Sequence, residues 1–451
     1  MKTRAREKRA QSSIRALPIG FAAMIAIGTA LLMLPAATRD GAGLPFLSAL
    51  FTATSASCVT GLIVVDTGTA FTLFGQCVIL LLIQLGGLGF MTAAAILFVL
   101  IGKRISMSER ITLAQSFGET QLQGAVRLGM LAARVTFCCE AAGAALLAIR
   151  FIPQFGALRG SFYAVFHAVS AFCNAGFDLM GGYASLTAYT GDPLVNFTVM
   201  ALIVTGSLGF AVILDGFRKR RFRLLRLHGR IVLPATAALI LGGAALVLLL
   251  EHGNAKTLGA LPPAQRALAA LFQSVTFRTA GFNTIDQASL TDATKLLGVL
   301  LMLVGGAPAG TAGGLKITTF MVMLYAVRAE LRGRRDTEAL NRRIPEATVR
   351  RALCLITIGL LLVTVGTMGV SLMERQTGVS FIDQLYEVVS ALCTVGLSVG
   401  LTGAACAGTR VVLILLMFVG RVGMLTVALS LSARHRGDAP VRLPEEDILI
   451  G

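Results

Sequence analysis

Four short stretches of the chain share one pattern, in which a run of small and polar residues ends in a single glycine. They read SASCVTGL (55–62), SAFCNAGF (170–177), SVTFRTAGF (274–282) and SALCTVGL (390–397). The glycines are Gly61, Gly176, Gly281 and Gly396, at intervals of 115, 105 and 115 residues. An interval this regular indicates four structural repeats. Because glycine reaches backbone conformations that other residues avoid, such loops could turn successive carbonyl oxygens toward a dehydrated cation.

The four glycine motifs also resemble ordinary helix ends, where glycine is the common C-terminal cap. Four copies between apolar segments make that interpretation unlikely, and the last copy holds the Thr-Val-Gly sequence that a K⁺ selectivity filter needs. The sequence therefore predicts K⁺ sites at the four glycines. The predicted ion-binding residues are Val59, Thr60, Gly61, Asn174, Ala175, Gly176, Thr279, Ala280, Gly281, Thr394, Val395 and Gly396.

The composition is that of a membrane protein. Of the 451 residues, 55% are hydrophobic and only 14% are charged, and the mean hydropathy is +0.78. Because backbone groups in lipid must pair within the chain, we expect helices. The net charge of +17 could suggest nucleic-acid binding. The basic residues cluster in short loops between apolar segments, however, which is the pattern of cytoplasmic loops.

Long and short apolar segments alternate along the chain. The long ones, predicted to cross the membrane, are 16–35, 71–101, 126–151, 193–217, 231–251, 293–327, 351–373 and 410–432. The short ones, predicted as re-entrant pore helices, are 44–54, 160–172, 264–277 and 381–392. The predicted fold is an all-α polytopic membrane protein with four tandem span–pore helix–span repeats, eight transmembrane helices in all, around a pseudo-fourfold pore. The repeats are 1–112, 113–228, 229–345 and 346–451.

The basic clusters fix the expected orientation. They lie in the leader (1–15), around 218–230 and around 328–343, always between or outside repeats. Both termini are therefore expected in the cytoplasm of a multi-pass plasma (inner) membrane protein. Residues 106–123 are more polar and predict an amphipathic helix on the inner surface.

The second long segment of the third repeat contains GGAPAGTAGGLK (305–316), which no straight helix would favour. Irregular backbone at membrane depth is tolerated against a water-filled cavity, so this gate loop is predicted to plug the pore below the filter. A phosphate-binding loop would need glycine directly before lysine, but Leu315 intervenes. The predicted gate residues are Gly305, Gly306, Gly310, Gly313, Gly314, Lys316 and, in the last span, Arg421, whose guanidinium can donate to free carbonyls.

Other residues near the motifs are predicted to have structural roles. Arg278 replaces the Cys found in the other three copies and is expected to point behind the filter toward acids or carbonyls. Those cysteines, Cys58, Cys173 and Cys393, are expected to be buried packing residues. Arg134 and Glu140 lie within a predicted span, with partners left open. No enzyme activity, metal cluster or organic cofactor is predicted in this chain.

The four motifs, the gate loop and Arg421 together make the chain resemble the Trk/Ktr/HKT potassium-uptake superfamily. The absence of helices before the first repeat and the short apolar tail (447–451) are most similar to a Ktr-type pore subunit. The resemblance implies a homodimer with one pore per chain and a cytosolic ring of nucleotide-binding regulatory subunits of the RCK/KTN type, carrying ATP or ADP. It also implies K⁺ as the transported ion, with Na⁺ as a possible activator. Some plant relatives in this superfamily have serine at the first filter position and pass Na⁺, so the glycine at position 61 implies that the transported ion is K⁺.

Two alternatives stay open at this point. One is a Trk-type subunit with a different partner or with ion coupling. The other is a secondary carrier for another solute, since carriers also use repeats and broken helices.

Overall fold

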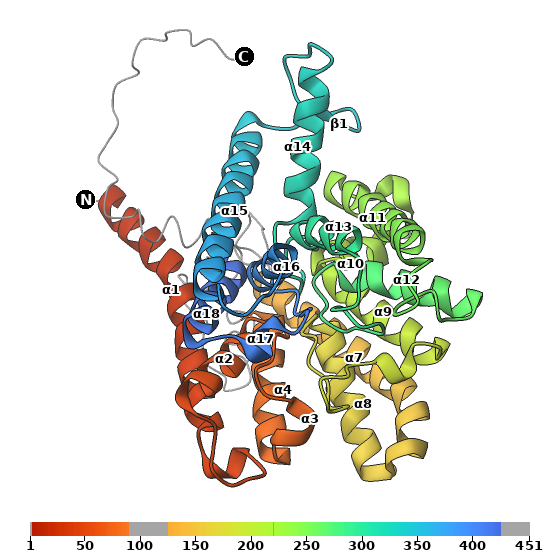
Figure 1. Ribbon diagram of the computed structural model, residues 1–451. Coiled ribbons are helices and arrows are strands. Elements are labelled where there is room, and N and C mark those ends of the chain that lie inside the picture. Colours follow the sequence, from red (N-terminus) through yellow and green to blue (C-terminus); the bar gives the residue numbers. More distant parts are fainter. Residues whose placement is uncertain (1, 90–124, 220, 425–451) are drawn as a thin grey trace.

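The computed structural model describes residues 2–89, 125–219 and 221–424, and most of them lie in helices (Figure 1). The chain begins with one long helix, then a short one, then the first glycine motif and another helix. These elements are α1 (Lys2–Leu32), the 3₁₀ turn η1 (Pro35–Ala37), α2 (Phe46–Ser57), α3 (Thr67–Ala70) and α4 (Leu73–Leu88).

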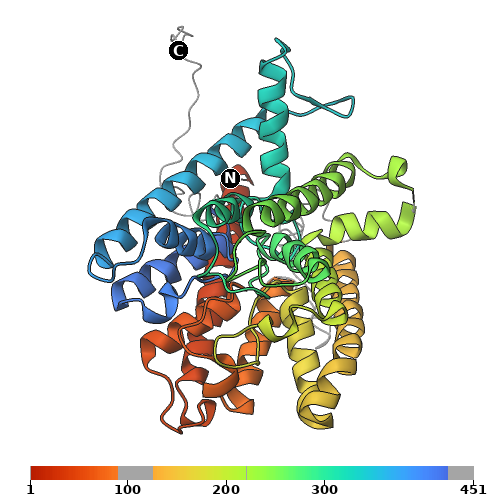
Figure 2. The same cartoon turned by 45° about the vertical axis from the view of Figure 1, so that its right-hand side comes forward.

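The same order of a long helix, a short helix, a glycine motif and a second helix recurs three times. The second group is α7 (Ala125–Phe155), α8 (Ala157–Phe172), η2 (Thr187–Tyr189), α9 (Pro193–Ser207) and α10 (Phe210–Lys219). The third is η3 (Phe222–Leu224), α11 (Leu227–Glu251), α12 (Pro263–Thr276), α13 (Asp292–Leu303) and α14 (Ile317–Glu330). The fourth is α15 (Glu346–Met373), α16 (Phe381–Leu392), α17 (Leu401–Ala404) and α18 (Ala407–Val422). Figure 2 shows the four groups arranged around the central loops.

The short helices α2, α8, α12 and α16 each end four or five residues before a motif glycine. Their bounds lie within three residues of the short segments predicted from sequence. Each is mostly buried toward its C-terminal end, where small residues such as Ala53, Ala56 and Ala171 are 0% exposed. This burial places four helix C-termini at the centre of the molecule.

Three described helices are long and apolar enough to cross a membrane: Gly129–Phe155, Leu227–Glu251 and Glu346–Met373. The pair α9 and α10 would make a fourth span, but it is bent by 97°. Parts of the predicted spans 71–101 and 410–432, and the predicted amphipathic helix 106–123, lie outside the described residues. The chain is therefore an all-helical membrane protein in its broad architecture.

In each group the second helix ends before the predicted span does, and only the break in the third group, at the gate loop, was predicted from the sequence. The predicted span 193–217 is divided: α9 ends at Ser207, and Gly209 with a φ of +81° redirects the chain into α10. Helices α4 and α18 end similarly, at Gly89 (φ +81°) and Gly423 (φ +99°). In the third group α13 and α14 are separated by residues 304–316. The glycines allow these breaks because a positive φ costs them no Cβ clash.

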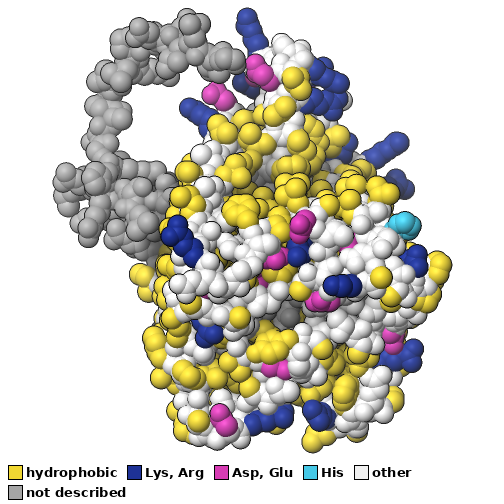
Figure 3. Space-filling view, viewed as in Figure 1, with side chains coloured by type: hydrophobic (Ala, Val, Ile, Leu, Met, Phe, Trp, Pro, Cys, Tyr) yellow, Lys and Arg dark blue, Asp and Glu magenta, His cyan; other side chains and the backbone are white. Residues whose placement is uncertain are grey.

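A small hairpin departs from the purely helical prediction. Strands β1 (Glu338–Ala339) and β2 (Arg342–Arg343) pair antiparallel, with Glu338 opposite Arg343 and Ala339 opposite Arg342. Together with the end of α14 the hairpin projects from one end of the molecule (Figure 1). Figure 3 shows several Lys and Arg side chains around this projection, while the rest of the visible surface mixes hydrophobic side chains with uncharged polar ones and backbone and carries scattered charges.

Candidate functional site

The four glycine motifs, more than a hundred residues apart in sequence, form one closed ring. A Cβ atom placed on any of the four glycines would lie within 3.0 Å of a carbonyl oxygen of the next motif. These pairs are Gly61 with Ala175, Gly176 with Ala280, Gly281 with Val395, and Gly396 with Thr60. The last pair returns to the first motif, so the ring is complete. Only glycine fits here, because any side chain would collide with the backbone of its neighbour.

The backbone within each motif is turned by two left-handed residues. One is the glycine, with φ between +69° and +99°. The other lies two positions earlier, where a side-chain-bearing residue has a φ of +48° to +66°, an uncommon conformation outside glycine. These residues are Val59, Asn174, Thr279 and Thr394. Strain repeated at four equivalent positions is typical of a functional loop held by its surroundings.

Hydroxyl groups of the short helices hold the loops in this conformation. Ser55 Oγ accepts the amide of Gly61, and Ser390 Oγ accepts that of Gly396, both at 3.1 Å. Ser390 Oγ also bonds the carbonyl of Leu397 at 2.7 Å. The serine six residues before the glycine is the sequence signal for this support. In the third motif that place is Val275, and Thr276 supplies the hydroxyl, to the carbonyl of Phe282.

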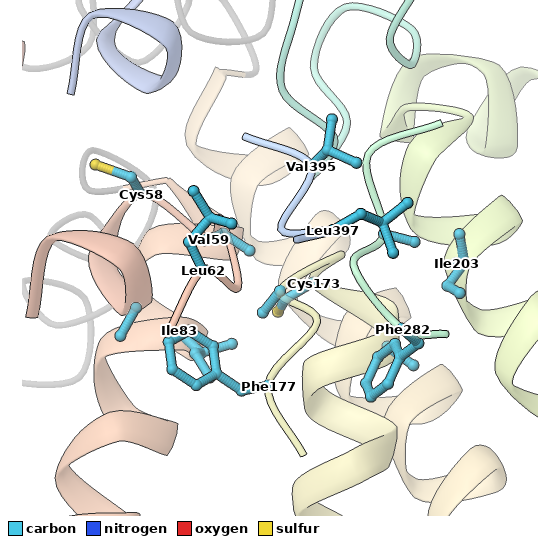
Figure 4. Close-up of a cluster of buried hydrophobic side chains, with 14 of the residues drawn as sticks. Cys58, Val59, Leu62, Ile83, Cys173, Phe177, Ile203, Phe282, Val395 and Leu397 are labelled. Atoms are coloured by element: carbon cyan, nitrogen blue, oxygen red, sulfur yellow. The ribbon is translucent and has the colours of Figure 1, made fainter. Parts of the chain in front are cut away.

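The residues after the four glycines pack around the ring (Figure 4). They are Leu62, Phe177, Phe282 and Leu397, each at most 1% exposed. Three cysteines lie behind the motifs, at 0% exposure: Cys58, Cys173 and Cys393. The packing role predicted for these cysteines agrees with their positions. The C-terminal ends of the four short helices carry partial negative charge next to the ring, which favours a cation there.

One side of the ring opens into a cavity of about 440 Å³. The four glycines form part of its lining, together with residues that follow them, such as Asp178, Asn283 and Ser398. The exposed Asp286 lies at the same cavity. Acidic groups in a narrow entrance raise the local concentration of cations.

The gate loop predicted at 305–316 lies at the opposite end of the motifs. Thr311 Oγ1 bonds both the carbonyl of Phe172 at 3.0 Å and Oδ1 of Asn174 at 3.1 Å. A Cβ on Gly313 would collide with Thr394 and with the carbonyl of Cys393. The loop is therefore packed directly against the ring on the side away from the cavity.

The ends of the gate loop are held together by backbone pairing. Val304 and Leu315 form a parallel bridge, and the amide of Gly305 bonds the carbonyl of Leu315 at 2.8 Å. The bend between α9 and α10 makes room for the loop, whose Ala307 amide bonds the carbonyl of Ser207 at 2.8 Å. The helix therefore ends before Gly209 because the gate loop occupies the space that a continuous helix would fill.

Two of the predicted cationic residues contact the gate loop. One guanidinium nitrogen of Arg421 donates to the carbonyl of Thr311, and the other donates to that of Gly86 near the end of α4. Lys316 Nζ donates to the carbonyl of Ala312, within the loop itself, at 2.6 Å. Arg421 therefore ties the loop to a helix of the first group.

Arg278 and Glu140 both lie behind the ring. Arg278 is 3% exposed and donates to the carbonyl of Gly305 at 3.3 Å, so it points away from the cavity as expected. Glu140 is 5% exposed; its carboxylate accepts from Gln84 Nε2 at 3.3 Å and from the thiol of Cys173 at 3.8 Å. Arg134 is exposed and forms no pair with Glu140.

Three further glycines that sequence reasoning missed position the short helices. A Cβ on Gly86, Gly206 or Gly420 would collide with the carbonyl of the last residue of a short helix, at Ser57, Phe172 and Leu392 respectively. Each lies three residues before the break at Gly89, Gly209 or Gly423. This repeated spacing of three residues between two glycines is the pattern in the sequence that could have identified them.

We expect Gly420→Ala to destabilise the folded protein by about 1–3 kcal/mol, the usual cost of overpacking. The added methyl group would push the C-terminus of α16 away from α18. Thermal unfolding in detergent measures the effect, with Gly369→Ala as the control because nothing lies near that glycine. Equal stability of the two variants would show that the close approach has no structural importance.

Comparison with known proteins identifies the family. The family model described as "TrkH: Cation transport protein" matches residues 3–442. The chain belongs to the TrkH family. The resemblance predicted from the sequence is thereby confirmed. A similar relative is the Ktr system potassium uptake protein B of Bacillus subtilis, 40% identical over 435 residues, which are 96% of each chain.

Two further comparisons agree with the family. The potassium/sodium uptake protein NtpJ of Enterococcus hirae is 39% identical over 455 residues, covering 100% of this chain and 99% of that protein. The crystal structure of the potassium transporter TrkH from Vibrio parahaemolyticus matches with a TM-score of 0.75 over 93% of this chain and 84% of that one. At 16% identity, that match shows a common fold.

Proposed function

We propose that this chain is the pore-forming subunit of a K⁺ uptake system, with the four-glycine ring as its selectivity filter. The observation that carries the proposal is ring closure: each motif places a carbonyl beside the glycine of a neighbour, and the fourth meets the first. Carbonyl oxygens around one axis can replace the water shell of K⁺. The potassium uptake activity named for the 40% and 39% identical relatives supports K⁺ as the ion. Family relatives are transport proteins, and we propose no enzyme activity and no cofactor in this chain.

The experiment is rescue of a bacterium deficient in K⁺ uptake, grown in low K⁺, with and without a cytosolic partner. We expect growth to be restored and Rb⁺ to be taken up. Failure of a well-expressed, membrane-inserted chain to support Rb⁺ uptake with any partner would contradict the proposal. That outcome would favour the secondary carrier for another solute.

The membrane arrangement is part of the proposal. Four repeats, 1–112, 113–228, 229–345 and 346–451, would each contribute two spans and a pore helix around the ring. The basic loops at 218–230 and 328–343 support a cytoplasmic location for both termini in the plasma membrane. The cavity of about 440 Å³ would then face outside and the gate loop would lie toward the cytoplasm. A homodimer with one pore per chain follows from the family resemblance.

The gate proposal assigns 305–316 as the barrier to ion flow and Arg421 as the group that holds it. It is supported by the bonds of Thr311 to the second motif and of Arg421 to the loop. Opening would require those contacts to break and the loop to move aside, with its glycines as hinges.

We further propose that the basic end of the molecule binds a nucleotide-binding regulatory subunit of the RCK/KTN type, with Na⁺ as a possible activator of uptake. A groove of about 360 Å³ between α14 and the hairpin is lined by Arg328, Arg332 and Arg334. Because α14 continues from the gate loop, a partner bound there could pull directly on the gate. A Trk-type subunit with ion coupling is the alternative, and K⁺ flux driven by a Na⁺ or H⁺ gradient alone would favour it.

We expect the double variant Arg328→Glu, Arg332→Glu to reduce co-purification of the regulatory subunit by about tenfold, a loss of about 1.4 kcal/mol. The two exposed arginines both line this groove: Arg328 lies in the last turn of α14, and Arg332 lies in the turn that follows the helix. Arg375→Glu is the control. Arg375 is also exposed, but it lies after the C-terminal end of α15 and does not line the groove. Full retention of the partner by the double variant would contradict the binding surface.

A further inference from the structure

A buried carboxylate lies behind the fourth motif without an ion-pair partner. Glu387 is on α16, nine residues before Gly396, and is 0% exposed. Its carboxylate accepts from the amide of Val399 at 3.0 Å, from Thr402 Oγ1 at 2.7 Å and from Ser398 Oγ. No Lys or Arg pairs with it within the described part of the chain. All three hydrogen bonds that the carboxylate accepts therefore come from the segment that follows Gly396.

That loop is the outer end of the fourth motif. Ser398 and Val399 follow Gly396 by two and three residues and line the entrance cavity. From the same helix, Ser390 holds the amide of Gly396 and the carbonyl of Leu397. One helix therefore fixes both halves of the strand, and the outer half is fixed by a buried carboxyl group that accepts three hydrogen bonds.

The second motif has a counterpart at the equivalent position. His167 lies nine residues before Gly176 and is 0% exposed. Its Nδ1 lies 2.7 Å from the carbonyl of Tyr163, which leaves Nε2 free to accept the amide of Leu179 at 3.4 Å. Leu179 follows its glycine by three residues, as Val399 does. Two motifs on opposite sides of the ring therefore have their outer ends anchored from behind.

At the equivalent position, nine residues before the glycine, the other two motifs have no residue that holds the outer end in this way. The equivalent residues are Thr52, whose hydroxyl has no partner within the described residues, and Phe272, which cannot accept a hydrogen bond. The carboxylate of Glu387 is the strongest of the anchors because it holds three donors. Loss of this one acceptor should therefore loosen the outer end of the fourth motif more than loss of the acceptor at the equivalent position loosens the second.

We propose that Glu387 is a positioning residue that fixes the outer end of the filter and thereby sets discrimination between K⁺ and Na⁺. The inference rests on the proposed role of the ring as a selectivity filter. With the anchor in place, the carbonyls near Gly396 are held at a spacing suited to K⁺. Without it they can move inward and coordinate the smaller Na⁺, so selectivity falls while the pore stays open.

The test is the K⁺/Na⁺ permeability ratio of the full chain in liposomes. We expect Glu387→Gln, which offers an amide NH₂ toward three donors, to lower the ratio about tenfold, equivalent to about 1.4 kcal/mol. Glu387→Asp keeps the charge and should retain part of the selectivity. If Glu387→Gln does not fold, Thr402→Val takes its place in the test. This variant removes one of the three donors to Glu387, and we expect it to lower the permeability ratio a few-fold.

Glu374→Gln is the matched control. Glu374 is 2% exposed and accepts from the amide of Cys406 at 2.9 Å and from Thr409 Oγ1 at 2.8 Å, at the start of α18 rather than at the filter. An unchanged ratio in folded Glu387→Gln, or an equal fall in Glu374→Gln, would overturn the inference. Gly396→Ser separates the two proposals: if it also leaves the ratio unchanged, the filter assignment itself is wrong.

Discussion

Deleting residues 307–311 raises K⁺ flux through the reconstituted protein by at least about tenfold at matched protein density. The deletion joins Gly306 to Ala312, and these two residues already lie close together, since a Cβ on Gly306 would be 2.7 Å from that of Ala312. It removes Thr311, which bonds the second motif and accepts from Arg421. Each lost hydrogen bond is worth about 0.5–1.5 kcal/mol, so losing two or three shifts the equilibrium between the closed and the open form by roughly tenfold or more.

Arg421→Ala separates a gate from a merely structural loop. It removes the tie between the gate loop and α4 but leaves the loop in place, so we expect a smaller rise in flux. Dependence on the regulatory subunit should weaken in the same order, most in the deletion and less in Arg421→Ala. If the deletion lowers flux while the protein remains folded and keeps the oligomeric state of the native chain, the loop is structural and the gate assignment is wrong.

Gly61→Ser lowers the K⁺/Na⁺ permeability ratio by about tenfold or more, while total cation flux can stay high. A side chain at this φ of +99° is strained, and its Cβ would collide with the carbonyl of Ala175. The carbonyl must move, and a displacement worth even 1.4 kcal/mol between the two ions changes the ratio tenfold. Bi-ionic reversal potentials in planar bilayers measure the ratio directly.

The control for Gly61→Ser is Gly242→Ser on α11. Nothing lies near that glycine, and its φ is not positive, so the same chemical change touches no neighbour. The two variants should have similar expression and stability in detergent. A Gly61→Ser protein that is folded and retains the native ratio would contradict the filter assignment.

The central ring could be predicted because its requirement is local. A backbone turn with positive φ and no space for Cβ selects glycine at each of Gly61, Gly176, Gly281 and Gly396, so the signal appears four times in one sequence. The ends of the short helices followed from the same motifs, since an apolar segment of about twelve residues is too short to span a bilayer. The gate loop was visible because six of its twelve residues are glycine or proline.

The features that were missed depend on contacts between distant segments. The breaks at Gly209 and Gly423 look like ordinary glycines in apolar helices, and only the packing of the gate loop and the short helices explains them. The bond from Thr311 to Asn174 joins residues 137 positions apart, and no pattern in either segment indicates it. The partners of Glu140 were likewise hidden, because Gln84 belongs to the first group of helices and Cys173 lies 33 residues further along the chain.

The most direct test of the account is the cation selectivity of the purified chain in liposomes under a K⁺ gradient against equal Na⁺. The account predicts a reversal potential close to that of K⁺ for the native ring, shifted toward zero when any of Gly61, Gly176, Gly281 or Gly396 is changed to serine. Four equivalent shifts would follow from one closed ring of backbone carbonyls. A native protein that does not distinguish K⁺ from Na⁺, or serine variants that keep the native potential at all four positions, would contradict it.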